Sequence, residues 1–372
     1  MNPNLKYRIA FSRITANNPR IAKILFERSP NLKEFFNKEI NFSTIPGLTE
    51  RGIKRLKKIN YEKFLALAEK EIEFIKAHNI SPLFITDKEY PHRLSMCEDA
   101  PLLLYLLGKN RLNSTKIISI VGTRKPTTSG RDFCEKLVAE IAKRHKDAVV
   151  VSGLAYGVDI GAHRAAIKNG VATYGIMAHG LDRIYPSAHT NTAKEMLGMG
   201  GLLTEFMSGT NSDKQNFVKR NRIIAGLADV TIVVESAEKG GALITAGIAQ
   251  SYNRDVMAMP GRVNDKYSRG CNHLIKSNIA AMIESVEDIE YITGWEPDDC
   301  QKEHQRSLFD TFESKEEELI STLLKKSEDR EMNINTIARS CNMPVNKVSA
   351  TLLNMELKGA VKAGTGGFFR LL

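Results

Sequence analysis

The pattern of apolar and polar positions divides this chain into three stretches. Up to about residue 70 the apolar side chains recur at helical spacing, as in Ile21, Ile24 and Leu25. Between residues 116 and 292 short apolar runs alternate with longer amphipathic segments, and after residue 315 the helical spacing returns. The first and last patterns are typical of helical domains, whereas the middle one predicts a parallel sheet with helices on its faces.

The middle stretch, within a predicted domain of residues 71–292, has the pattern of a doubly wound α/β fold. A buried strand is expected at 102–108, and six further apolar runs predict strands at 117–121, 148–152, 173–177, 202–204, 230–234 and 256–259. Helices are expected between them at 130–144, 158–168, 216–226 and 242–253. Ligands of such folds bind outside the carboxyl ends of the strands, so we expect the functional residues there.

Both flanking stretches predict small helical domains. In residues 1–70, the segment 43–48 predicts a helix-hairpin-helix turn whose backbone N–H groups face a DNA phosphate, or a simple turn between packed helices. Residues 293–315 have the polar composition of a linker. Residues 316–372 predict a winged helix, with helices at 316–326, 336–341 and 345–358 and a glycine hairpin near 365–367.

The charge balance favours an anionic partner. Of 372 residues, 53 are lysine or arginine and 43 are aspartate or glutamate, which gives a formal charge of +10. Nucleic acid and an acidic membrane surface are both compatible with this excess. The five cysteines form no CxxC pair, so neither a disulfide framework nor a zinc site is expected. Because no apolar run approaches about 18 residues, we expect a cytoplasmic protein without a membrane contact.

The strand ends carry residues suited to an anion. Gly122 and Arg124 follow the 117–121 strand, and Ser152 and Gly153 begin a glycine-rich turn in which Gly157 opens the next helix. An arginine at a strand end can bind phosphate through two N–H groups, and the free N–H groups at a helix start attract negative charge. The glycines either admit a ligand or allow tight packing of strand against helix.

A later helix opens with three basic residues, Lys219, Arg220 and Arg222. Cations in the first turns of a helix oppose its dipole, so this arrangement is expected to need a nearby anion. Phe217 lies three and four residues before Arg220 and Asn221, so the three share one side of the helix. On that side Phe217 either stacks on a nucleic-acid base or packs in the core.

Two more glycine turns, at Lys239-Gly240-Gly241 and at 260–261, extend the same predicted edge into a groove. Four side chains are candidate acid–base groups: Asp159, His163, Glu205 and Glu235. No nucleophile elbow, paired metal-binding histidines or Cys/His set accompanies them, and neither a dinucleotide fingerprint nor a Walker loop is present. We therefore predict no catalytic residue, metal or cofactor, and interpret the carboxylates as partners of the arginines.

Several motifs together closely resemble the DNA-processing protein A (DprA/Smf) family. They are VGTR at 121–124, SGLAYGVDIGAH at 152–163, HGLDRIYP at 179–186, RNRIIAGL at 220–227, GGALITA at 240–246 and GCNHLI at 270–275. The resemblance implies an extended Rossmann core, preceded by a helical domain of the SAM or helix-hairpin-helix kind and followed by a winged helix. It further implies a homodimer that binds and protects single-stranded DNA during natural transformation and loads the RecA recombinase.

The resemblance also implies where DNA is bound. The residues that match the family's basic pocket are Arg124, Arg220, Arg222, Lys194 and Lys239, with the backbone of Gly122, Gly153 and Gly157. This chain departs from the family in having Gly240-Gly241-Ala242 where a serine-containing turn is common, and Cys271 where threonine is usual. These turns therefore lack the family's hydroxyls, although their backbone N–H groups remain.

Two other functions stay open at the level of sequence. One is a nucleotide-processing hydrolase of the lysine-decarboxylase-like fold, whose P-G-G-x-G-T motif is replaced here by residues 238–243 without a following glutamate. The other is a duplex-binding regulator that uses the winged helix. Its helix at 345–358 offers only Lys347 and Lys358 as cations, with Glu356 opposing them, so a protein-interaction role is favoured there.

Overall fold

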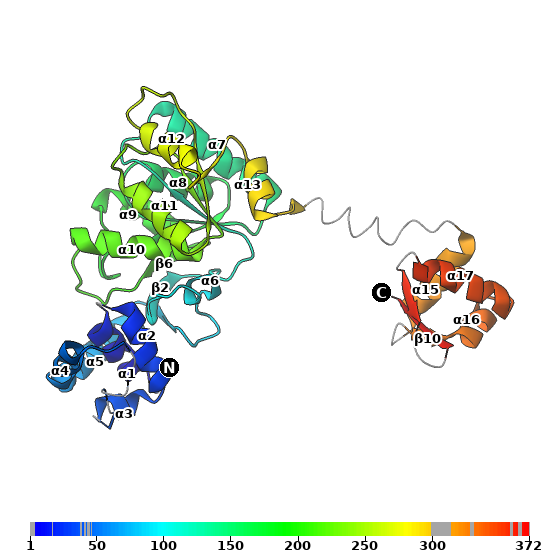
Figure 1. Ribbon diagram of the computed structural model, residues 1–372, viewed down its shortest axis with the longest axis horizontal. Coiled ribbons are helices and arrows are strands. Elements are labelled where there is room, and N and C mark those ends of the chain that lie inside the picture. Colours follow the sequence, from blue (N-terminus) through cyan, green and yellow to red (C-terminus); the bar gives the residue numbers. More distant parts are fainter. Residues whose placement is uncertain are drawn as a thin grey trace. The chain divides into compact units, whose positions relative to one another are not determined.

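The protein consists of two compact units, Met1–Trp295 and Glu296–Leu372, which are described separately. Figure 1 shows the computed structural model. It describes residues 4–16, 18–37, 39–40, 42, 45, 47–298, 314–327, 331–357, 360–363 and 367–371. Among these residues, no helix is both long and apolar enough to cross a bilayer.

Five helices open the first unit: α1 (Leu5–Thr15), α2 (Pro19–Arg28), α3 (Leu32–Phe36), α4 (Glu50–Lys57) and α5 (Tyr61–Ala77). Their core is aromatic, with the rings of Phe11 and Phe35 packed edge to face at 4.8 Å. It continues onto the first strands of the sheet through Phe84 and Tyr105. The predicted boundary at residue 70 lies within α5, and residues 43, 44 and 46 of the predicted hairpin turn lie outside the described residues.

The sheet of this unit has nine strands in the order β1-β2-β6-β5-β4-β3-β7-β8-β9. Their bounds are β1 Ser81–Phe84, β2 Leu103–Gly108, β3 Ile117–Val121, β4 Val149–Ser152, β5 Ala172–Ile176, β6 Gly201–Thr204, β7 Val230–Val233, β8 Asp255–Ala258 and β9 Ala281–Met282. Strands β1, β2 and β6 pair antiparallel, and the rest of the sheet is parallel. The seven predicted strands are confirmed as β2 to β8, whereas the short strands β1 and β9 were not predicted.

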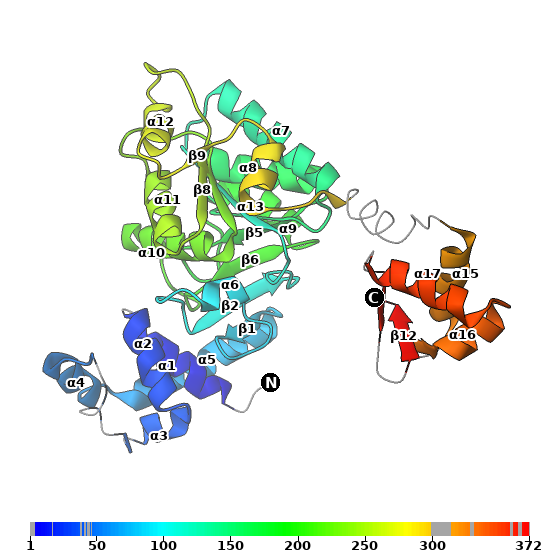
Figure 2. The same ribbon diagram turned by 45° about the vertical axis from the view of Figure 1, so that its right-hand side comes forward.

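Helices cover both faces of the sheet (Figure 2). The helices that follow β1 along the chain are α6 (His92–Ser95), α7 (Thr128–Arg144), α8 (Val158–Lys168), α9 (Thr190–Met196), α10 (Lys214–Leu227), α11 (Gly241–Ser251), α12 (Arg269–Lys276) and α13 (Val286–Thr293). One buried cluster joins the sheet to α7, α8 and α13, and another joins its opposite face to α10, α11 and α12. Because both faces are covered, β3 is buried along its whole length and shows no alternation.

The strand order reverses at β3. From β3 the chain adds β4, β5 and β6 on one side, and then crosses through α10 to place β7 on the other side of β3. Ser119 of β3 accordingly pairs with Val151 of β4 and with Thr231 of β7. In a doubly wound sheet, the helices that leave such a point diverge and open a crevice at the carboxyl ends of the strands.

The second unit is a winged helix, as predicted. Its elements are α15 (Lys315–Lys326), β10 (Glu331–Asn333), α16 (Ile334–Ser340), α17 (Val345–Leu357), β11 (Val361–Ala363) and β12 (Phe368–Leu371). The three strands pair in the order β10-β12-β11, and Ile320, Ile337 and Leu352 are fully buried between the helices. Most of the predicted linker, residues 299–313, and most of the glycine hairpin, at 365–366, lie outside the described residues.

Candidate functional site

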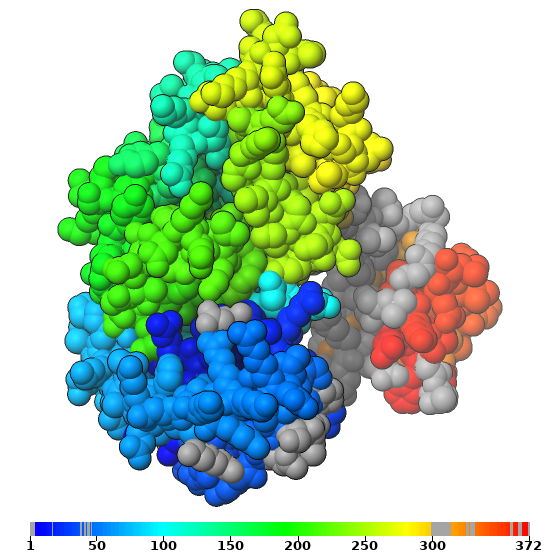
Figure 3. All heavy atoms as spheres, turned by 60° about the vertical axis from the view of Figure 1, so that its left-hand side comes forward, coloured from blue at the N-terminus to red at the C-terminus, as the bar shows by residue number. Residues whose placement is uncertain are grey.

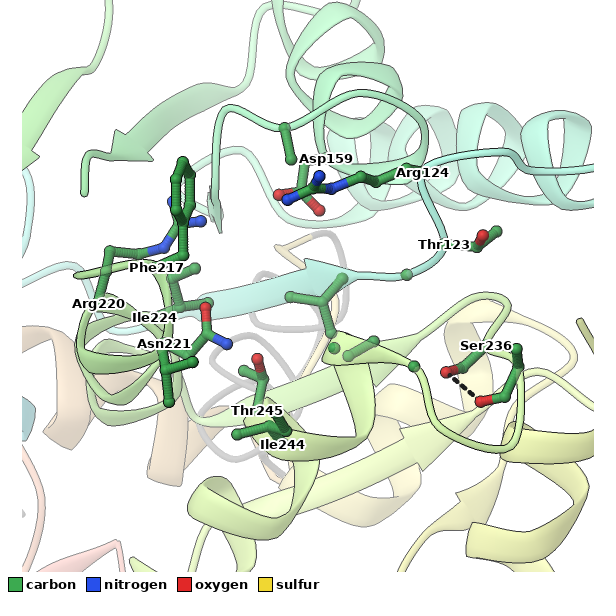
Figure 4. A pocket seen from close by; sticks show the side chains of 18 of the residues that line it. Thr123, Arg124, Asp159, Phe217, Arg220, Asn221, Ile224, Ser236, Ile244 and Thr245 are labelled. Carbon is green, nitrogen blue, oxygen red and sulfur yellow. Dashed lines mark hydrogen bonds between the residues drawn. The ribbon is translucent and has the colours of Figure 1, made fainter. Parts of the chain in front are cut away.

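A cavity of about 390 Å³ opens at the switch point of the sheet. Its walls come from the turns after β3, β4 and β7 and from three helices: the first turn of α8, α10 and the first turns of α11 (Figure 4). Three of the predicted glycine turns are therefore brought together here. The turns after β5, β6 and β8 do not line this cavity, so the turns at the strand ends do not together form the groove that was predicted.

Two arginines reach this cavity from different walls, with one carboxylate near both. Arg124 is exposed on the turn after β3, and Arg220 is only 5% exposed on α10. Asp159, in the first turn of α8, lies close to the guanidinium of Arg124 in Figure 4. Burial raises the pKa of Asp159, and the charges of Arg220 and Arg124 act in the opposite direction.

Arg220 is incompletely satisfied within the protein. Its Nη1 donates a hydrogen bond to the backbone oxygen of Ile176. Its buried Nε has no hydrogen-bond partner among the described residues. Burial lowers the pKa of Arg220, and the carboxylate of Asp159 opposes this shift. A buried guanidinium that retains unused donor capacity favours an anion in the adjoining cavity.

Backbone donors and another cation complete the anion-binding character of the cavity. Gly240 and Gly241 begin α11, and no side chain caps that helix start. The unpaired N–H groups of a helix N-terminus carry partial positive charge. Lys214, the first residue of α10, also lines the cavity, so three cationic side chains face one carboxylate. Lys214 was missed because the helix was expected to begin at residue 216.

Phe217, Arg220 and Asn221 all line the cavity, which confirms that they share one side of α10. The guanidinium carbon of Arg220 lies 5.8 Å from the centre of the Phe217 ring. Tyr185 approaches Phe217 from outside, with ring centres 6.1 Å apart, and is 52% exposed. The motif at 179–186 contains Tyr185, but nothing in the sequence indicated that it meets α10.

The prediction that three cations lie in the first turns of α10 and oppose its dipole is wrong, because the helix begins earlier than expected. The helix begins at Lys214 with Asp213 as its N-cap residue. Lys219, Arg220 and Arg222 therefore lie beyond its first turn, where the dipole has little effect. The feature that calls for an anion is the burial of Arg220, which the sequence did not reveal.

Arg222 faces away from the cavity because residues two positions apart point to different sides of a helix. Its Nη2 forms an ion pair of 2.5 Å with Glu205, and both side chains are 9% exposed. Its Nη1 donates to the backbone oxygen of Asp99 at 2.6 Å. The predicted residues Lys194 and Lys239 are exposed on α9 and on the turn before α11, and neither lines the cavity.

The predicted glycines act mainly through packing. Gly122 lines the cavity, but Gly153 and Gly157 do not. A Cβ on Gly153 would lie 2.3 Å from the Asp159 carboxylate and 2.7 Å from Arg220 Nη1. Gly157 has a φ of +84°, and its Cβ would lie 2.2 Å from the backbone oxygen of Thr123. Ser152 is buried and donates to the backbone oxygen of Ile120 at 2.6 Å.

The other candidate acid–base groups have structural partners. Glu205 pairs with Arg222, and Glu235 accepts hydrogen bonds from the backbone and hydroxyl of Thr127 at 2.9 and 2.5 Å. His163 is fully buried beneath the turn after β4. Its Nε2 donates to the backbone oxygen of Gly153 at 2.5 Å, and its Nδ1 lies 2.7 Å from the Thr173 hydroxyl. Within the described part of the chain, no three His, Cys, Asp or Glu side chains form a metal site.

The burial of His163 predicts a measurable pH dependence of stability. Burial lowers its pKa from 6.5 to about 4. The unfolded chain therefore takes up a proton before the folded protein does, so stability is lost as pH falls from 6.5 towards 4. We expect the free energy of unfolding to drop by about 3 kcal/mol over this range on account of His163.

Urea titrations of the wild-type protein and His163→Gln at several pH values isolate this contribution. The difference between the two unfolding free energies should shrink by about 3 kcal/mol between pH 6.5 and pH 4. A constant difference would show that His163 does not titrate as expected.

Comparisons with known proteins agree with this architecture. Residues 81–293 match the family model described as DNA recombination-mediator protein A, and residues 313–367 match the DprA winged helix domain. The chain is 30% identical to Protein Smf of Escherichia coli (strain K12) over 83% of both proteins. It is 38% identical to DNA processing protein DprA of Bacillus subtilis (strain 168) over 61% of this chain and 76% of that one.

Two solved structures are similar as well. DNA processing protein A from Streptococcus pneumoniae is 30% identical, with a TM-score of 0.63 over 76% of this chain and 96% of that one. The protein of the same name from Helicobacter pylori, reported for its single-stranded DNA binding mode, is 30% identical, with a TM-score of 0.51 over 56% and 93%. The matched family model spans more than half of the chain and includes every wall of the cavity. This chain therefore belongs to the DprA/Smf family of DNA recombination-mediator proteins.

Proposed function

We propose that this protein binds single-stranded DNA, independently of base sequence, in the cavity at the carboxyl ends of β3, β4 and β7. The observation that carries the proposal is the buried Arg220, whose Nε has no partner among the described residues and which lines one cavity with the exposed Arg124 and the uncapped start of α11. A DNA phosphate would supply the negative charge and the acceptors that these groups lack. The relative from Helicobacter pylori, reported for its single-stranded DNA binding mode, supports the same ligand.

The shape and lining of the cavity favour a single strand over a duplex. A volume of about 390 Å³ suits one or two nucleotides of a flexible strand but not the body of a double helix. Phe217 and Tyr185 offer aromatic faces near the cavity, on which unpaired bases can stack. Every base has a face for stacking and every nucleotide a phosphate, so binding is expected to tolerate any sequence.

Replacing Arg124 by alanine tests the phosphate contact. We expect about tenfold weaker binding for oligonucleotides of every base composition, because one phosphate loses its charged partner. The slope of log affinity against log salt should fall by about 0.7, the value for one contact with a single strand. Fluorescence anisotropy titrations over a range of salt concentrations measure both quantities.

Lys194→Ala is the matched control, because Lys194 is exposed but outside the cavity. It should leave affinity and salt slope nearly unchanged. Equal binding of duplex and single strand by the wild-type protein, or a loss in Arg124→Ala confined to certain bases, would contradict the proposal.

We further propose that the protein acts in the cytoplasm as a homodimer that protects incoming strands during transformation and loads RecA onto them. Family membership supports this role. A protein that loads RecA onto single strands must itself bind them, as we propose for the cavity. The test is RecA assembly on oligonucleotides covered by a single-strand-binding protein. Wild-type protein should accelerate assembly, whereas Arg124→Ala should do so less. Light scattering tests the dimer, and no acceleration by a protein that still binds DNA would overturn the loading role alone.

A further inference from the structure

Helix α4 carries a stripe of cations along one side. Arg51, Lys54, Arg55 and the C-cap residue Lys58 follow one another at intervals of three, one and three residues, which places them on one face of a helix. All four are exposed, whereas Leu56 is buried on the other side of the helix. The stripe lies outside the cavity described above.

The helix dipole favours Lys54 and Arg55, which lie in the last turn, but the stability of the helix does not explain the whole stripe. None of its four cations forms an ion pair with a described residue, since the recorded ion pairs all lie elsewhere. The pairs Arg51–Arg55 and Lys54–Lys58 are four residues apart, and like charges at this spacing repel. Arg51 also lies in the first turn, where the helix dipole disfavours a cation. An external polyanion would relieve both sources of repulsion.

Two further hollows are lined by residues that lie between the cavity and this stripe. A second hollow of about 400 Å³ shares Val218 of α10 with the cavity and reaches Pro19 and Arg20 at the corner between α1 and α2. A third, of about 210 Å³, begins at Asn18 and Ile21 of the same corner and ends at Arg55 of α4. Figure 3 shows green residues of the α/β part above the blue residues of the N-terminal helices on one face of the molecule.

We propose that a DNA strand bound in the cavity continues over Val218 and the α1–α2 corner to α4, whose stripe binds its phosphates. This inference rests on the proposed single-strand function and extends its footprint onto the helical domain. A single strand can follow the bent path between the hollows, whereas a stiff duplex cannot. Lys219, which lines the second hollow, places another cation along the way.

The test compares Arg51→Gln/Arg55→Gln with the wild type on two oligothymidines, of about 6 and about 30 nucleotides, lengths that bracket typical single-strand site sizes. The short one should occupy the cavity and its immediate surroundings without reaching the stripe, so its affinity should not change. The long one should bind about tenfold less tightly, with a salt slope lower by about 1.4 for two lost contacts. Arg51→Lys/Arg55→Lys keeps both charges and should retain most of the wild-type affinity for the long strand.

Lys136→Gln/Lys143→Gln is the charge-matched control, because α7 covers the opposite face of the sheet from α10. Equal affinities of the stripe variant and this control for the long strand would overturn the inference while leaving the cavity function intact. An equal loss on both oligonucleotides would also overturn it, because the stripe would then not act as a separate contact. Failure of the wild-type protein to bind either strand would instead refute the proposed function itself.

Discussion

Replacing Gly157 by alanine is expected to destabilise the protein by about 3 kcal/mol and to abolish tight DNA binding. Gly157 has a φ of +84°, which a residue with a Cβ rarely adopts. Its Cβ would also lie 2.2 Å from the backbone oxygen of Thr123 and 2.6 Å from the Cα of Arg124. Backbone atoms cannot rotate away, so the turn that carries Arg124 must move. Urea unfolding and anisotropy titration measure the two effects.

Gly161→Ala provides the matched control in the same helix. Gly161 lies in α8 four residues after Gly157, and apart from its own helix turn and chain neighbours no atom lies within 4 Å of its added Cβ. Alanine has the higher helix propensity, so this variant should gain about 0.5–1 kcal/mol of stability and bind DNA normally. Equal behaviour of the two variants would show that backbone crowding at the β3 turn has been misjudged.

Replacing Arg220 by methionine should lower both stability and affinity. The Asp159 side chain is 8% exposed and would lose the main charge that opposes the effect of its burial. Leaving a buried carboxylate without its compensating charge costs about 3 kcal/mol or more. Binding should weaken beyond the effect of Arg124→Ala, because Arg220 and the Phe217 ring form one wall together. Urea titrations and binding assays of folded protein separate the two losses.

The double variant Arg220→Met/Asp159→Asn distinguishes the two roles of this arginine. Neutralising Asp159 removes the uncompensated buried charge, so stability should recover by at least half. Affinity should not recover, because the guanidinium that would bind phosphate is still missing. If stability stays as low as in the single variant, the loss in Arg220→Met does not come from the uncompensated charge of Asp159. If affinity returns, Arg220 does not contact DNA.

The local pattern of apolar and polar residues predicted most of the strands and helices. Short apolar runs bounded by glycine turns predicted β2 to β8 to within about two residues, because strands buried on both faces need continuous apolar runs. The glycines of the turn at 152–157 were predicted either to admit a ligand or to allow tight packing, and at Gly153 and Gly157 the structure shows tight packing. Strand β1 was missed because its four residues include a proline, and β9 because it has only two residues.

The sequence predicted only some of the residues that line the cavity together. Gly122, Arg124, Phe217, Arg220, Asn221 and Gly240 were predicted and line one cavity. Helical spacing was enough to group Phe217 with Arg220 and Asn221, and the same spacing argued against grouping Arg220 with Arg222. Family resemblance nevertheless placed Arg222 in the pocket, and the structure shows it paired with Glu205 instead.

The sequence alone determined which segments form strands and helices, that glycines and cations follow the strand ends, and the family to which the chain belongs. These properties depend on neighbours within a few residues along the chain. Only the tertiary structure decided that β3, β4 and β7 meet at the switch point, that Arg220 is buried near Asp159, and that separate hollows are lined by Val218 of α10 and by Arg55 of α4. Burial and charge pairing depend on residues far apart in sequence, and packing of the whole unit brings them together.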